Sequence, residues 1–245
     1  MSSTGDTAVV IPARNERDLI EATVTSAAAL PGVDLVIVVD DGSRDGTASA
    51  AEGAGATVVR HGRSCRKGAA MENGAEAVRL LDAAERRAAP RHLLFLDGDL
   101  GAAAGNASPL IEPVRAGTAD MTIAAFTNRV RLGGHGFVVR LSAAGIKRAT
   151  GWQPAQPLNG QRCLTRDALE KARPLARGFG AETALTIDLL RRGLRVTEVD
   201  VDLAHRATGA GWHAQLHRAR QFADVAAALA ARRALLPSGS PPVRG

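Results

Sequence analysis

The sequence of 245 residues predicts an α/β fold in which helices flank a mostly parallel sheet. Two observations support this prediction. Short apolar runs alternate with longer helical patterns through the first half of the chain, which is the rhythm of strand–helix–strand units. Three of the apolar runs also end in clusters of polar residues. Because the carboxyl ends of parallel strands meet at one edge of a sheet, and ligands bind there, a site is expected at this edge.

The strands predicted in the first half are short runs of apolar residues, many of them β-branched. They lie at Thr7–Ile11, Leu35–Asp40, Thr57–Arg60, His92–Leu96 and Asp120–Phe126. The segments between them are rich in alanine and leucine, which favour helices that return the chain to the start of the next strand. These helices are expected at Arg17–Leu30, Gly46–Glu52, Gly68–Arg87 and Ala107–Ala116.

The second half differs in composition and begins with a segment rich in glycine and basic residues, Arg129–Thr150. Prolines interrupt the next segment, and Gly193 is placed to end a helix. The elements expected there are a loop, a helix, a strand, a polar loop and a last helix, at Gly151–Asn159, Glu182–Arg192, Arg195–Val201, His205–Gly211 and His213–Arg232. The tail Pro237–Gly245 is expected to be disordered. The chain shows no internal repeat or linker, so a single domain is expected.

Composition narrows the classes of function. The formal net charge is +6, but aromatic residues make up only 3% of the chain, which argues against a stacking surface for nucleic acid. A phosphate-rich small substrate or an anionic membrane surface suits the charge better. The two cysteines, Cys65 and Cys163, form no disulfide framework, and no apolar run is long enough to span a membrane. A cytoplasmic protein is expected, with attachment to the inner face of the membrane as an alternative.

A pair of carboxylates follows the apolar run at residues 92–96. Asp97 and Asp99 stand on either side of Gly98, and residues two apart on a strand share a face. Both are therefore expected to project to the same side at the edge of the sheet. Two such carboxylates repel each other unless a cation lies between them, and oxygen ligands suit Mg²⁺ or Mn²⁺. The structural alternative is a polar turn that simply ends a core strand.

The ends of the first two strands carry further polar residues. Asp40 and Asp41 follow the second strand, where a carboxylate can accept hydrogen bonds from a ribose hydroxyl or a base. After the first strand, residues 12–16 contain no glycine, so the glycine-rich turn of dinucleotide-binding folds is missing. The sequence also has no phosphate-binding loop of the Gly-x-x-x-x-Gly-Lys-Ser/Thr type. These absences exclude NAD-binding and P-loop functions.

Four other residues are candidates for a site: two basic side chains that suit phosphate, a carboxylate and a histidine. Lys67 precedes a predicted helix, where backbone N–H groups and a cation together attract phosphate, although a solvated basic loop is the alternative. Glu182 begins another helix, where the dipole favours its ionised form, as it does for any first-turn glutamate. In the loop that follows the last strand, His205 can add a nitrogen ligand to a metal held by carboxylates, and Arg206 can meet a phosphate. A lone histidine is otherwise an ordinary polar side chain.

Together these motifs resemble those of family 2-like glycosyltransferases, which use nucleotide sugars and have the GT-A fold. The similarity rests on residues 10–16, 39–47, 67–68 and 96–99, while residues 157–162, 178–182 and 205–206 are similar to the glucosyl-3-phosphoglycerate synthase branch. The resemblance implies metal-dependent transfer from a nucleoside-diphosphate sugar, with a UDP-sugar favoured, to a small phosphorylated or hydroxylated acceptor. It implies one domain over residues 1–236, with a nucleotide-binding half at about 7–100 and an acceptor-binding half at about 101–236.

The resemblance also implies a role for each matching residue. The nucleotide-sugar pocket would comprise Pro12, Ala13, Arg14, Glu16, Asp40, Asp41, Lys67, Asp97, Gly98 and Asp99. Mg²⁺ or Mn²⁺ would be held by Asp99 and His205. The acceptor would be bound by Asn159, Gly160, Gln161, Arg162 and Arg206. Glu182, Asp99 and Lys67 would be catalytic, with Glu182 a base if the transfer inverts the anomeric configuration and a positioning group if it retains it.

Alternatives remain open at this point. Residues 159–161 depart from the Gly-Gly-Glu of the phosphoglycerate branch, and polyprenyl-phosphate glycosyltransferases that use GDP-mannose or UDP-glucose share the N-terminal motifs. Arg129–Thr150 would then be a membrane contact, or else an acceptor lid. A sugar-phosphate nucleotidyltransferase is disfavoured because residues 12–16 are not glycine-rich. A non-catalytic basic protein that binds nucleic acid or a membrane would show steep salt dependence and no metal-dependent nucleotide binding. The oligomeric state is open between a monomer and a homodimer.

Overall fold

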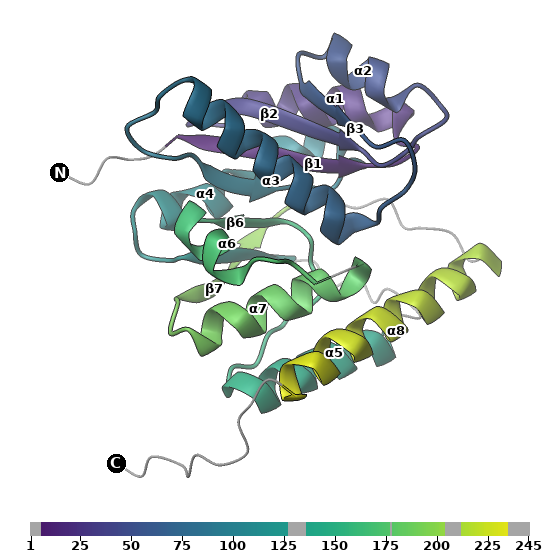
Figure 1. Cartoon of the computed structure of the whole chain (residues 1–245), viewed down its shortest axis with the longest axis vertical. Coiled ribbons are helices and arrows are strands. Elements are labelled where there is room, and N and C mark those ends of the chain that lie inside the picture. Colours follow the sequence, from purple (N-terminus) through teal and green to yellow (C-terminus); the bar gives the residue numbers. More distant parts are fainter. Residues whose placement is uncertain (1–5, 127–135, 177, 204–211, 235–245) are drawn as a thin grey trace.

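The computed structural model describes residues 6–126, 136–176, 178–203 and 212–234, and it confirms the α/β prediction (Figure 1). The described residues form a seven-stranded sheet with the order β3-β2-β1-β4-β6-β5-β7. The strands are β1 (Thr7–Ala13), β2 (Val33–Asp40), β3 (Thr57–Arg60), β4 (His92–Phe95), β5 (Met121–Phe126), β6 (Arg162–Leu164) and β7 (Val196–Val201). All neighbouring strands are parallel except β6, which runs antiparallel to both β4 and β5.

Helices cover both faces of this sheet. They are α1 (Arg17–Ala28), α2 (Thr47–Gly53), α3 (Lys67–Ala84), α4 (Ser108–Arg115), α5 (Gly136–Thr150), α6 (Arg166–Ala172), α7 (Ala181–Arg191) and α8 (Trp212–Ala234), with short 3₁₀ turns η1 (Gly101–Ala107) and η2 (Gly178–Gly180). Side chains alternate along a strand, so Val9 and Ile11 pack toward α1 and α4, whereas Ala8 and Val10 pack toward α3. The second core also includes residues of α6 and α7, which lie on the same side as α3 (Figure 1). β1 is thus buried on both faces, as its continuous apolar run predicts.

The two outermost helices, α5 and α8, lie side by side next to α7 (Figure 1). The ring centroids of Phe137 and Phe222 are 5.7 Å apart across this pair. The sequence did not indicate a helix in Arg129–Thr150, and residues 127–135 of that segment lie outside the described residues. The loop His205–Gly211 and the tail Pro237–Gly245 also lie outside the described residues. No helix in the described part of the chain is both long and apolar enough to cross a membrane.

The three polar clusters do meet at one edge of the sheet. β1 pairs in parallel with both β2 and β4, with Ala13 opposite Asp40 and Val10 opposite Phe95. One part of the prediction was wrong, because β4 ends at Phe95 and residues 97–99 form a turn beyond the strand. The alternation of side chains on a strand therefore does not set the directions of Asp97 and Asp99.

A buried ionic cluster lies at the opposite end of α3 from the polar edge. The carboxylate of Asp82 accepts hydrogen bonds from Arg91 Nη1 at 2.7 Å and from Arg166 Nη2 at 3.3 Å. The backbone N–H of Arg91 also donates to this carboxylate at 3.2 Å. All three side chains are less than a tenth exposed. This carboxylate therefore joins α3 to the start of β4 and to α6 in a low-dielectric region.

Removing this carboxylate should destabilise the fold more than removing an exposed one. We expect Asp82→Ala to lower the free energy of unfolding by about 3–5 kcal/mol, because it leaves the buried Arg91 and Arg166 without their shared carboxylate. The matched control is Glu52→Ala, which breaks an exposed pair with Arg60 and should cost less than about 1 kcal/mol. Urea unfolding measures both values. Equal losses in the two variants would contradict the expectation.

Candidate active site

The turn at residues 97–99 is held by close packing on the loop that follows β1. A Cβ atom at Gly98 would lie 3.1 Å from Ala13 Cβ and 3.3 Å from Glu16 Cγ, so a larger residue would push these groups apart. From α1, the hydroxyl of Thr23 accepts a hydrogen bond from the Gly101 N–H at 2.8 Å and lies 3.0 Å from the Gly98 carbonyl oxygen. Helix α1 therefore fixes the position of the carboxylate turn.

Negative charge is concentrated where this turn meets Glu16. Partial burial, together with the charges of Asp99, Asp45 and Asp97, raises the pKa of Glu16 to about 7. Burial is the largest cause of this shift, and repulsion from the three aspartates adds to it. Carboxylate oxygens are the type of ligand that Mg²⁺ and Mn²⁺ prefer. The residues at this edge therefore fit a divalent cation.

The raised pKa of Glu16 predicts how the free energy of unfolding depends on pH. The native state holds this proton from pH 4.5 up to about pH 7, whereas the unfolded chain releases it near 4.5. Without metal, this group therefore lowers the free energy of unfolding as the pH rises through that interval. We expect Glu16→Gln to be more stable than the wild type by roughly 1 kcal/mol at pH 8, after allowance for solvent screening, and equally stable at pH 4. Urea unfolding in a chelator tests this, with Glu21→Gln as the exposed control.

Lys67 lies between two carboxylates, those of Asp97 and Glu182. Its Nζ donates to Asp97 Oδ1 at 2.7 Å and lies 3.2 Å from Glu182 Oε1. Burial opposes its charge, but the two carboxylates outweigh burial and raise the pKa of Lys67 above its ordinary value. Glu182 is only 3% exposed, and the other oxygen of Asp97 accepts a hydrogen bond from Gln161 Nε2 at 2.7 Å. The result is a fixed chain of charges that joins α3, the carboxylate turn and α7.

The segment from Pro157 to Arg162 packs against the charged side chains of Lys67 and Asp97. A Cβ at Gly160 would lie 2.3 Å from Lys67 Nζ, so only glycine leaves room for the ammonium. Asn159 and Gln161 are buried, and Asn159 donates to the Ala124 carbonyl oxygen at 2.6 Å. These contacts give the segment a structural role close to the charged side chains.

The side chain of Arg162 is not exposed, although its expected role is to bind the acceptor. It is fully buried, and its guanidinium donates to the backbone oxygens of Pro157, Asn159 and Glu182 and to the hydroxyl of Thr186. Burial lowers the pKa of Arg162 to about 10. In this structure the guanidinium is occupied by these contacts, and the assignment of Arg162 to acceptor binding stays a prediction. Its contacts tie the 157–162 segment to the first turns of α7.

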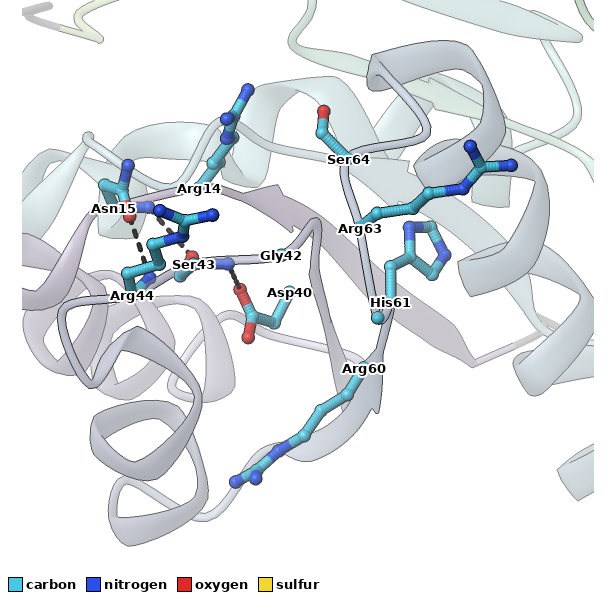
Figure 2. A pocket seen from close by; sticks show the side chains of 11 residues that line it. Arg14, Asn15, Asp40, Gly42, Ser43, Arg44, Arg60, His61, Arg63 and Ser64 are labelled. Carbon is cyan, nitrogen blue, oxygen red and sulfur yellow. Dashed lines mark hydrogen bonds between the residues drawn. The ribbon is translucent and has the colours of Figure 1, made fainter.

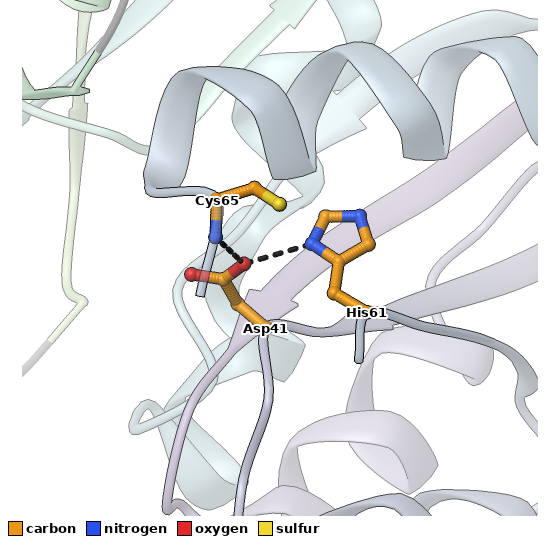
Figure 3. A group of neighbouring side chains, drawn as sticks. All are labelled: Asp41, His61 and Cys65. Carbon is orange, nitrogen blue, oxygen red and sulfur yellow. Dashed lines mark hydrogen bonds and ion pairs between the residues drawn. The ribbon is translucent and has the colours of Figure 1, made fainter. Parts of the chain in front are cut away.

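Asp41 organises the loop that follows β3. Its carboxylate accepts hydrogen bonds from Ser64 Oγ at 2.6 Å, Cys65 N at 2.7 Å, His61 Nδ1 at 2.8 Å and Arg66 N at 3.1 Å. Although partial burial opposes ionisation, these bonds hold the pKa of Asp41 below its ordinary value. Ligand atoms of Asp41, His61 and Cys65 lie within 4.8 Å of one another (Figure 3), but the four donors account for this arrangement without a metal.

The loops after β1 and β2 are joined to each other. Asn15, in the left-handed conformation that asparagine tolerates, donates its N–H to Ser43 Oγ at 2.9 Å. Its side-chain oxygen accepts the N–H of Arg44 at 3.1 Å. Asp40 turns back to accept the Ser43 N–H at 3.0 Å, so it shapes the turn after β2. These hydrogen bonds fix the loops after β1 and β2 relative to each other.

Two cavities open at this edge of the sheet. One, of about 630 Å³, is lined by seven of the residues expected at the nucleotide-sugar pocket. These seven are Pro12, Ala13, Arg14, Glu16, Asp41, Lys67 and Asp97. The other, of about 980 Å³, contains Asp40 and four arginines, Arg14, Arg44, Arg60 and Arg63 (Figure 2). Arg14 and Ser64 line both cavities, which are therefore adjacent.

Some site residues were missed and others are not described. Phe179, from the motif at residues 178–182, lines the smaller cavity together with Arg220 and Asp224, which come from α8, more than 100 residues beyond Asp97 in the chain. No local motif marks Arg220 and Asp224, because only the folding of α8 against η2 brings them to the site. The proposed metal ligand His205 and its neighbour Arg206 lie outside the described residues.

Comparisons with known proteins identify the family of the chain. Residues 8–141, more than half of the chain, match the family model "Glycosyl transferase family 2". The chain is 31% identical over 209 residues to glycosyltransferase AglJ of Haloferax volcanii, a match that covers 82% of this chain and 64% of that relative. This chain thus spans less than two thirds of the length of that protein.

Similar solved structures include glucosyl-3-phosphoglycerate synthase from Mycobacterium tuberculosis. Its complex with phosphoglyceric acid is 27% identical, with a TM-score of 0.75, over 96% of this chain and 82% of that one. Its complex with Mn²⁺, UDP-glucose and phosphoglyceric acid is 26% identical, with the same TM-score and coverage. The match of more than half the chain to the family model, together with this GT-A-like sheet and its edge of carboxylates, establishes that the chain belongs to glycosyl transferase family 2.

Proposed function

We propose that the protein transfers a sugar from a nucleoside-diphosphate sugar, with a UDP-sugar favoured, to a small phosphorylated or hydroxylated acceptor in a reaction that needs Mg²⁺ or Mn²⁺. The observation that carries this proposal is the distribution of charge in the 630 Å³ cavity. Glu16 and Asp97 supply carboxylates, while Arg14, Arg66 and Lys67 supply cations around the same space. A metal-bound diphosphate needs both kinds of group.

The solved relatives support the choice of ligands. Crystals of the mycobacterial synthase contain UDP-glucose, Mn²⁺ and phosphoglyceric acid together, and others contain Mg²⁺ and UDP. We propose that residues 7–100 of this chain bind the nucleotide and that residues 101–236 complete the acceptor side. The smaller cavity is lined by both parts, which is consistent with this division.

Within this proposal, Asp99 and His205 would hold the metal, and a divalent cation there would supply positive charge to compensate the diphosphate. Lys67 keeps a fixed positive charge beside Asp97 and orients that carboxylate toward the ribose or the sugar. Asp41 holds the loop at residues 61–66 over the nucleotide. Glu182, paired with Lys67, accepts a hydrogen bond from a hydroxyl of the sugar or of the acceptor.

Calorimetric titration with UDP and with GDP, each with and without Mn²⁺, is the experiment that tests the proposal. We expect micromolar binding of UDP that requires the metal. A preference for GDP would keep the transferase but change the donor to GDP-mannose. If neither nucleotide binds, the proposal is wrong. Turnover of UDP-glucose with phosphoglyceric acid, compared with turnover on vesicles that carry a polyprenyl phosphate, then separates a soluble acceptor from a lipid one.

A further inference from the structure

Helix α8 is attached to the smaller cavity through one carboxylate. Asp224 Oδ2 accepts a hydrogen bond from the backbone N–H of Phe179 at 3.1 Å, and Asp224 Oδ1 lies 3.4 Å from Arg66 Nη1. The side chain of Asp224 is 17% exposed. Phe179 belongs to η2, whereas Arg66 immediately precedes α3. A single side chain thus connects the last helix to two segments that line the cavity.

The glycines of η2 allow this close approach. A Cβ at Gly178 would lie 2.0 Å from Asp224 Oδ2, and a Cβ at Gly180 would lie 2.5 Å from the backbone oxygen of Asp224 and 2.8 Å from Ala228 Cβ. Gly68 is crowded in the same way, because its Cβ would lie 2.3 Å from the backbone oxygen of Ala176. Neither the turn nor the start of α3 therefore has room for a side chain where these segments meet.

This junction is continuous with the charged groups of the site. Glu182 follows Gly180 by two residues, and Lys67, which pairs with Glu182 at 3.2 Å, immediately precedes Gly68. A shift of η2 away from α8 would therefore move the start of α7, and Glu182 with it. Arg220, one turn before Asp224 on α8, would leave the cavity lining in the same movement.

We propose that Asp224 is a positioning residue, which holds α8 against the Gly178–Gly180 turn and thereby keeps Glu182 in place beside Lys67. This inference rests on the transferase function proposed above. The nucleoside is assigned to the ends of β1 and β2, which do not contact α8 through this residue. Loss of the contact between Asp224 and this turn should consequently slow transfer much more than it weakens nucleotide binding.

Four variants test the proposal. Asp224→Ala removes the oxygen that accepts the Phe179 N–H, whereas Asp224→Asn keeps one. Gly180→Ala blocks the approach of α8 by a different route, and because the φ of Gly180 is −82°, alanine itself fits the backbone there. The control is Asp188→Ala, which breaks the attachment of α8 to α7 through Arg232 Nε, 2.9 Å from Asp188 Oδ1, and which does not touch the cavity.

We expect Asp224→Ala and Gly180→Ala to lower kcat at least tenfold while the Kd of UDP with Mn²⁺ changes less than threefold. Asp224→Asn and Asp188→Ala should retain kcat within threefold. Hydrogen exchange gives a readout that is independent of turnover, because the Phe179 amide should exchange fast in Asp224→Ala and Gly180→Ala but not in Asp224→Asn or Asp188→Ala. An equal loss of kcat in Asp188→Ala would overturn the positioning role, as would full activity in Asp224→Ala with an exposed Phe179 amide. If the wild type itself neither binds UDP nor transfers sugar, it is the proposed function that fails.

Discussion

Replacing Asp99 with alanine is expected to lower metal-dependent sugar transfer by about 10³-fold while the protein remains folded. The proposed metal would lose its carboxylate ligand, and charge on the departing diphosphate would then be left without compensation. The fold should not suffer, because Asp99 adds to the repulsion that raises the pKa of Glu16. Transfer assays over a range of Mn²⁺ concentrations measure the effect, and circular dichroism checks the fold.

The control for this variant is Asp45→Asn. Asp45 also contributes negative charge near Glu16, but it lies on the loop after β2, where Asp45 Oδ1 accepts the Thr47 N–H at 3.0 Å. Removing its charge tests whether any loss of negative potential near Glu16 is enough to stop transfer. We expect less than a fivefold effect. Unchanged turnover in Asp99→Ala would reject the assignment of Asp99 to the metal.

Replacing Lys67 with methionine is expected to impair both transfer and stability. Glu182 is almost fully buried and would lose the ammonium 3.2 Å away, while Asp97 would lose its 2.7 Å hydrogen bond. An uncompensated buried carboxylate costs about 3 kcal/mol or more, and we expect the free energy of unfolding to fall by about that amount. Transfer should fall about 100-fold, because Asp97 and Glu182 would no longer be held in place.

Two further variants separate these effects. Lys171→Met removes an exposed lysine that pairs with Asp167 and should change stability by less than about 0.5 kcal/mol. In the double variant Lys67→Met with Glu182→Gln, the buried negative charge is removed together with its partner. We expect most of the stability to return in this double variant, but not the activity. Recovery of both would show that Lys67 acts only on the fold.

The strands at the centre of the sheet were predictable because their residues are apolar on both faces. β1 and β2 stand out as continuous apolar runs, and the parallel rhythm placed their polar ends at one edge. β6 was not predicted, since it is only three residues long and begins with Arg162, a charged residue that the structure buries completely. The cost of burying this guanidinium is offset by the carbonyl oxygens of Pro157 and Asn159 and by groups of Glu182 and Thr186 on α7, and no sequence pattern reveals these contacts.

The site shows the same division between local and distant information. The carboxylates at residues 40–41 and 97–99 and the lysine that begins α3 were recognisable, because each lies in a short motif at the end of a strand or the start of a helix. The contacts of Gln161 and Asp224 depend on how β6 and α8 fold back on the sheet. Thr165, whose hydroxyl caps the N-terminus of α6, was a local signal for the start of that helix, which was not predicted.

The two adjacent cavities have a consequence for the design of inhibitors. Because Arg14 and Ser64 line both, a fragment bound in one cavity would end close to a fragment bound in the other. Joining two such fragments makes the second binding event intramolecular, so that affinity can exceed that of either fragment by orders of magnitude. The four arginines of the larger cavity favour an anionic group on the fragment placed there.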